Sequence, residues 1–141
     1  MSTKEERLIF GKEAEEYCRK HFERIGVKVK TVTDHLGLNW TAELDKKIGD
    51  LILEIFGPKY IFIDVKRGSI SKESLEKFKG NYYFVYNSNL TELFIFKPED
   101  LKICSKLSYE RLSSNDWGIK LHLLKEHVSF LTLDEFILKL S

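Results

Sequence analysis

The sequence has no apolar segment long enough to cross a membrane. Apolar runs such as Tyr60 to Ile63 and Leu93 to Phe96 are far shorter than the roughly 20 residues of a membrane-spanning helix. Residues 1 to 17 carry charges throughout and lack the apolar centre of a secretory signal. We therefore expect no membrane span and a cytoplasmic location.

Cysteine is scarce, and histidine is not spaced as in a zinc site. Cys18 and Cys104 form no CxxC pair, and the four histidines lack the spacing of zinc ligands. Both cysteines have apolar neighbours and are expected to be small buried residues. A disulfide framework and a structural zinc site are therefore not expected.

Several common catalytic patterns are also absent. There is no glycine-rich phosphate loop, no serine in a nucleophile elbow, no repeat and no linker. The composition, 43% hydrophobic and 32% charged, is typical of a folded domain, and 141 residues suit a single domain spanning residues 1–141.

The net charge of +1 neither favours nor excludes a polyanionic partner, but the charge is unevenly distributed. Between Gly57 and Gly80 six cationic residues stand against three anionic ones, a local balance of +3. The cations Arg67, Lys72, Lys77 and Lys79 indicate either a solvated helix face or a strip that binds phosphates.

The first predicted element is a helix from Glu5 to Ile25. Thr3 and Glu6 have the spacing of a capping box, and Gly26 ends the helix. Apolar residues recur at helical spacing and predict the buried face, with His21 at its margin. This face comprises Phe10, Ala14, Tyr17, Cys18, His21, Phe22 and Ile25.

A strand is predicted over Val27 to Val32, followed by a long loop from Asp34 to Lys47 with few periodic apolar residues. Because long loops in compact domains are often functional or disordered, this loop is a candidate substrate-contacting segment. Trp40 within it, and Trp117, are candidates for exposed aromatic contacts.

The apolar runs Asp50 to Phe56 and Tyr60 to Lys66 flank Gly57 and Pro58 and predict a β-hairpin. Further elements follow in alternating types. They are a short helix capped by Ser71 and running to Lys79, the strands Tyr82 to Tyr86 and Leu93 to Phe96, a helix starting at Pro98, the strands Ile119 to Leu124 and Val128 to Leu131, and a terminal helix to Leu140 opened by Thr132 and Glu135. This order predicts an α/β fold with a central mixed sheet flanked by helices.

The hairpin carries the residues with the clearest chemical potential. Asp64 and Lys66 project from one face of their strand because successive side chains alternate. Asp50 begins the preceding strand and should lie near Asp64, provided that the numbers of paired residues sum to an even value near 114.

Two carboxylates at the end of a hairpin suit a hard divalent cation such as Mg²⁺, with Mn²⁺ as an alternative. Such an ion can polarise a phosphoryl oxygen and activate water. Lys66 can orient or deprotonate that water, or offset charge on the phosphate. A third carboxylate can come from the first helix, where Glu15 and Glu13 border opposite edges of the buried face.

Gly49-Asp50, followed after a strand and a turn by Ile63-Asp64-Val65-Lys66, resembles the PD-(D/E)xK motif of the restriction-endonuclease-like nucleases. Gly11 to Glu15, in a helix that ends near Gly26, resembles the first helix of Holliday junction resolvases and related members. The resemblance covers residues 11 to 87. Gly49 stands in place of the motif's proline, and no Gln-x-x-x-Tyr follows Lys66, so a RecB-like exonuclease is not supported.

The resemblance implies a restriction-endonuclease-like αβββαβ core. It also implies that Asp50 and Asp64 are metal ligands, Lys66 is the catalytic lysine and Glu15 is an auxiliary ligand. The leading hypothesis is a magnesium-dependent endonuclease that hydrolyses phosphodiester bonds of DNA, and the alternative is a non-catalytic nucleic-acid-binding or assembly module with the same fold. Members that cut both strands often pair, so a homodimer is an open alternative to a monomer.

Overall fold

A computed structural model describes residues 4–55, 59–106, 109–113 and 116–140. The predicted cap Thr3, the hairpin turn at Gly57 and Pro58, and the side chain of Cys104 lie outside the described residues.

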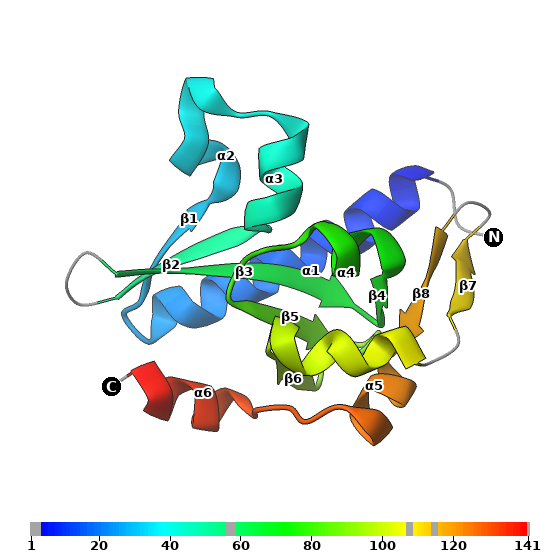
Figure 1. Cartoon of the computed structure of the whole chain (residues 1–141). Coiled ribbons are helices and arrows are strands. Elements are labelled where there is room, and N and C mark those ends of the chain that lie inside the picture. Colours follow the sequence, from blue (N-terminus) through cyan, green and yellow to red (C-terminus); the bar gives the residue numbers. More distant parts are fainter. Residues whose placement is uncertain (1–3, 56–58, 107–108, 114–115, 141) are drawn as a thin grey trace.

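The centre of the molecule is a five-stranded mixed sheet with the strand order β1-β2-β3-β5-β6 (Figure 1). Strands β3 and β5 are parallel, and the other neighbours are antiparallel. The strands are β1 (Lys28–Thr31), β2 (Leu51–Ile55), β3 (Lys59–Arg67), β5 (Tyr82–Tyr86) and β6 (Leu93–Phe96). The predicted mixed sheet and hairpin are confirmed.

Helices α1 (Lys4–Arg24) and α6 (Leu133–Leu140) cover one face of this sheet. Ala14, Cys18 and Phe22 are buried against β2, β3 and β5, as their four-residue spacing predicts. The predicted buried face is too wide, because Phe10, Tyr17 and Ile25 are 40–50% exposed. These three side chains lie beside the narrow strip of Ala14, Cys18 and Phe22 that contacts the sheet. Burial raises the pKa of the Cys18 thiol to about 12, so it stays neutral.

The opposite face carries a second apolar cluster beneath α4 (Lys72–Lys77), the 3₁₀ helix η2 (Pro98–Lys106) and α5 (Leu121–His127). Strand β5 serves both clusters, because Phe84 and Tyr86 point to one and Tyr83 and Val85 to the other. Its aromatic residues therefore belong mainly to the core.

A second sheet with the order β4-β8-β7 adjoins this face, formed by β4 (Ser69–Ser71), β7 (Glu110–Ser113) and β8 (Asp116–Lys120). The predicted strand Ile119 to Leu124 is wrong after Lys120, because Leu121 begins α5 and buries Leu121 and Leu124 at helical spacing. The predicted strand Val128 to Leu131 is also wrong, since its described pairing is a single bridge between Leu131 and Ile95.

The expected loop Asp34 to Lys47 is mostly helical. It contains α2 (Val32–Leu36), η1 (Gly37–Asn39) and α3 (Ala42–Ile48), and Val32 belongs to α2 and not to the preceding strand. The hydroxyls of Thr31 and Thr41 cap α2 and α3 by accepting backbone N–H groups. α3 buries none of its side chains, so no apolar stripe was available to reveal it.

The two other predicted caps are confirmed. Ser71 accepts the Ser74 N–H at the start of α4, and Thr132 and Glu135 form a reciprocal capping box at α6. Among the described helices, none combines the length and the apolar character needed to cross a membrane.

Candidate active site

The β2–β3 hairpin has the predicted register. Leu51 pairs with Ile63 and Ile52 with Phe62, so paired numbers sum to 114. The regular ladder ends there, and the Asp50 N–H donates to the Ile63 carbonyl at 2.8 Å. Asp50 and Asp64 line one cavity, which confirms that the hairpin brings these carboxyl groups to the same side.

Gly49 sets the chain direction into Asp50. Its φ is +102°, in the region that favours glycine, and a Cβ there would lie 2.6 Å from the Ile63 carbonyl oxygen. The close approach of the backbones therefore requires glycine at the position where the nuclease motif has proline.

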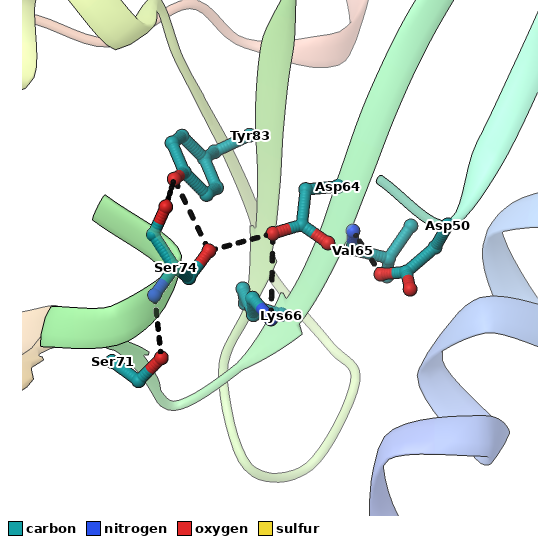
Figure 2. Close-up of polar contacts among 7 residues, drawn as sticks. All are labelled: Asp50, Asp64, Val65, Lys66, Ser71, Ser74 and Tyr83. Carbon is teal, nitrogen blue, oxygen red and sulfur yellow. Dashed lines mark hydrogen bonds and ion pairs between the residues drawn. The ribbon is translucent and has the colours of Figure 1, made fainter. Parts of the chain in front are cut away.

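Asp64 is the buried acidic group of the site, with 5% exposure. Its Oδ2 accepts a hydrogen bond from the Ser74 hydroxyl at 2.8 Å and lies 3.3 Å from the Lys66 ammonium. Figure 2 shows its other oxygen on the side facing Asp50. The Tyr83 hydroxyl donates to the Ser74 carbonyl at 2.9 Å, so α4 and β5 together fix the donor to Asp64.

Asp50 is held by the neighbouring strand, because its Oδ2 accepts the Val65 N–H at 2.8 Å (Figure 2). Burial raises the pKa of Asp50 well above its usual value, and the adjacent Asp64 raises it further. The two carboxyl groups would therefore repel each other if both were ionised, and a cation bound between them would reduce that repulsion.

Glu15 is the carboxyl group that α1 brings to this pair. Burial raises its pKa, contact with the Asp50 carboxyl opposes that rise, and the charge of Asp64 adds to it. Glu13 instead lies 3.6 Å from the Arg67 guanidinium. Of the two glutamates that the sequence left open, Glu15 is the one beside the aspartates.

Lys66 remains an ammonium group in this surrounding. Burial lowers its pKa, but the carboxylates of Asp64 and Asp50 outweigh that effect, so the pKa is raised. A lysine in this state supplies positive charge and hydrogen-bond donors, and it does not act as a base without first losing that proton.

The site is a cavity of about 210 Å³ between β3, α3 and α4. Its lining contains three of the expected site residues, Asp50, Asp64 and Lys66, and the expected phosphate-binding Lys77. Residues that sequence reasoning missed complete it: Asp45, Lys46, Ser71, Glu73 and Ser74. Ser71 was identified only as a cap, and Asp45 and Lys46 fall in the segment taken for a substrate-contacting loop.

The remaining expected substrate-binding residues lie outside this lining. The Lys72 ammonium is 3.9 Å from Glu76 and stacks over Tyr109, and Lys79 is exposed after α4. Arg67 is 11% exposed in its side chain, donates to the carbonyls of Phe10 and Ser88, and stacks on the Phe10 ring at 3.9 Å. The Arg67 guanidinium therefore ties α1 to the segment after β5.

Trp40 and Trp117 are 44% and 49% exposed, as expected for aromatic residues near loops. The Trp40 indole N–H donates to Asp45 Oδ1 at 3.2 Å, which links it to the cavity wall.

Within the described part of the chain, no three His, Cys, Asp or Glu side chains converge as a ready metal-binding group. Magnesium, however, is commonly held by one or two carboxylates, with water and substrate phosphates completing its shell. Asp50 and Asp64 supply two such carboxyl groups in one cavity, and their mutual repulsion favours a cation between them. The donor set fits a divalent ion of this kind.

Comparison with known proteins gives a structural likeness but no match by sequence. No family model matches the chain, and no curated protein does. The structure is similar to that of Hjc, a Holliday junction resolvase from the archaeal hyperthermophile Archaeoglobus fulgidus, with a TM-score of 0.52 and 14% sequence identity. The likeness covers 89% of this chain and 93% of Hjc. The likeness shows that this chain has the fold of that resolvase, which agrees with the fold that the sequence resemblance implied.

Proposed function

We propose that this protein is a divalent-metal-dependent endonuclease that hydrolyses DNA. The observation that carries the proposal is the cavity at the end of the β2–β3 hairpin, where Asp50, Asp64 and the charged Lys66 converge. The structural likeness to a resolvase supports the proposal. Because a fold alone does not define an activity, the proposal rests on the residues of the cavity itself.

Asp50 and Asp64 are the proposed metal ligands, and Glu15, beside Asp50, is an auxiliary ligand or positions the Asp50 carboxyl group. Magnesium, or manganese in its place, would supply a Lewis acid for the phosphoryl oxygen and a lowered pKa for attacking water. The ligands must be ionised to hold it, so metal binding and proton release from Asp50 are coupled.

Lys66 offsets the negative charge that develops on the phosphate. Asp64 holds its ammonium at 3.3 Å, and the pKa shift keeps it protonated, so the charge is oriented before substrate arrives. Ser74 positions Asp64 in turn, which leaves the carboxylate little freedom to rotate away from the cavity.

Lys77 is the predicted phosphate contact with the best position, because it lines the cavity. Lys72 and Lys79 lie outside the lining, and we expect them to contribute less to DNA binding. Because the similar structure is a Holliday junction resolvase, branched DNA should be tested as a substrate beside duplex and single-stranded DNA.

The test is cleavage of duplex, single-stranded and four-way branched DNA by the full chain with magnesium, with manganese and with EDTA. The proposal expects metal-dependent cleavage of at least one form and no cleavage in EDTA. Metal-independent binding of DNA without cleavage of any form would instead support the non-catalytic module.

A further inference from the structure

One ion-pair cluster joins the two short helices that border the cavity. The ammonium of Lys46 on α3 lies 2.6 Å from Glu73 Oε1 on α4, and the ammonium of Lys77 lies 3.5 Å from the same oxygen. All three residues line the cavity that contains Asp50 and Asp64. Two cations from separate helices thus converge on a single anionic oxygen beside the candidate active site.

The ion pairs of Glu73 with Lys46 and Lys77 are weak enough for another anion to replace the Glu73 carboxylate. The side chains of Lys46, Glu73 and Lys77 are each about half exposed, at 49%, 53% and 51%. Ion pairs of this exposure typically contribute less than about 1 kcal/mol, because water and salt screen them. Another anionic group can therefore take the place of the Glu73 carboxylate at little cost in free energy.

We infer that Lys46 and Lys77 form a binding site for a backbone phosphate of nucleic acid, which Glu73 occupies while the protein is free. This inference rests on the proposed function and adds a specific substrate contact to it. A phosphate oxygen meets the same two ammonium donors that the Glu73 carboxylate meets, and such contacts position a backbone without reading its sequence.

The charges that line the cavity explain why a polyanion would need Lys46 and Lys77. Among the described residues, four carboxyl groups and three ammonium groups line the cavity, so the cations do not outnumber the acidic groups. A polyanion then needs cations aimed at its phosphates, and each cation engaged by Glu73 is one that the substrate must first release. Glu73 therefore lowers the affinity of the free protein for nucleic acid.

The test is equilibrium binding of labelled duplex and branched DNA by fluorescence anisotropy over a series of salt concentrations, in EDTA to prevent metal-dependent cleavage. Glu73→Gln should tighten binding at low salt by up to about fivefold, the upper end of what one exposed ion pair provides. Lys46→Gln should weaken binding and reduce the slope of log K against log salt by about 0.9, the value for one duplex phosphate contact.

Glu76→Gln is the matched control. Glu76 lies on the same helix, pairs with Lys72 at 3.9 Å and does not line the cavity, so its substitution changes the net charge by the same amount. It should leave affinity nearly unchanged. In the double variant Lys46→Gln/Glu73→Gln, the gain from Glu73→Gln should shrink, because one of the two released lysines is missing.

Equal tightening by Glu73→Gln and Glu76→Gln would overturn the inference, since it would show a general effect of charge. Unchanged binding by Glu73→Gln and Lys46→Gln, with a wild type that binds and cleaves DNA, would overturn the inference and leave the proposed function standing. If the expected binding changes are seen but the wild type shows no metal-dependent cleavage, the phosphate site stands and the proposed endonuclease activity is overturned. A wild type that binds no DNA would overturn both.

Discussion

The two faces of strand β3 carry opposite kinds of residue over the same length. Ile61, Ile63 and Val65 point into the cluster under α1, where they are 0–7% exposed. Asp64 and Lys66 alternate with them and point to the other face, into the cavity beside α4. Strand β3 therefore supplies both core residues and candidate active-site residues. Substitutions one position apart should affect different properties, stability on one face and cleavage on the other.

The core face should show the largest effect on folding. Ile63→Ala removes a fully buried side chain at the centre of the sheet, and we expect a loss of about 2–5 kcal/mol in the free energy of unfolding. Urea denaturation followed by circular dichroism measures it. A loss below about 1 kcal/mol would mean that Ile63 is not packed as described.

Lys66→Ala, on the cavity face of β3, should reduce cleavage without unfolding the protein. We expect the cleavage rate to fall on the order of a hundredfold or more, because the charge that offsets the phosphate is gone, while the fold persists. Single-turnover cleavage and the unfolding curve are measured on one preparation. Lys79→Ala, outside the cavity lining, is the control and should retain most of the activity.

Asp50→Asn should stabilise the metal-free protein at neutral pH. The folded-state pKa of Asp50 is raised above the ordinary 3.8, so the folded protein holds this proton more tightly than the unfolded chain. Wild-type stability should therefore fall as pH rises from about 3.8 through the folded-state pKa, and the asparagine variant should lose less over that interval.

Unfolding in EDTA at a series of pH values measures this difference. Magnesium should reverse it, stabilising the wild type and not the variant. A variant that is less stable than wild type at neutral pH in EDTA would show that the carboxylate is not under the electrostatic strain described.

Ser74→Ala should give the smallest effect. It removes the hydroxyl that donates to Asp64 at 2.8 Å, a hydrogen bond to a charged group worth about 1.5–3 kcal/mol. Because Lys66 still contacts the same oxygen, we expect about a tenfold loss of cleavage rate and a shifted magnesium dependence. Ser74→Thr keeps the hydroxyl and should recover part of that loss.

Much of the hairpin could be predicted from the sequence, because its determinants are local. Side-chain alternation predicted the faces of Asp64 and Lys66, and the two apolar runs around Gly57 and Pro58 predicted the register. The first helix offered two candidate carboxyl groups, Glu15 and Glu13. Choosing Glu15 required the structure, since Arg67 draws Glu13 away through a contact between residues distant in the chain.

The rest of the site could not be predicted, because it depends on elements without a sequence signature. α3 buries none of its side chains and so showed no apolar period, which hid Lys46. Ser74 appears in the sequence as an ordinary polar residue of a short helix. Its role follows from the tertiary approach of α4 to β3 and from the Tyr83 hydroxyl on β5.

We propose that Asp50 and Asp64, at the end of the β2–β3 hairpin, hold the metal ion that DNA cleavage requires. The most direct test of this proposal compares wild type and Asp64→Asn, purified in parallel and both shown to be folded, for magnesium-dependent cleavage of duplex, single-stranded and branched DNA. We expect cleavage by the wild type and a loss of cleavage rate on the order of a hundredfold or more in the variant. A folded Asp64→Asn protein that cuts like the wild type would contradict the proposal.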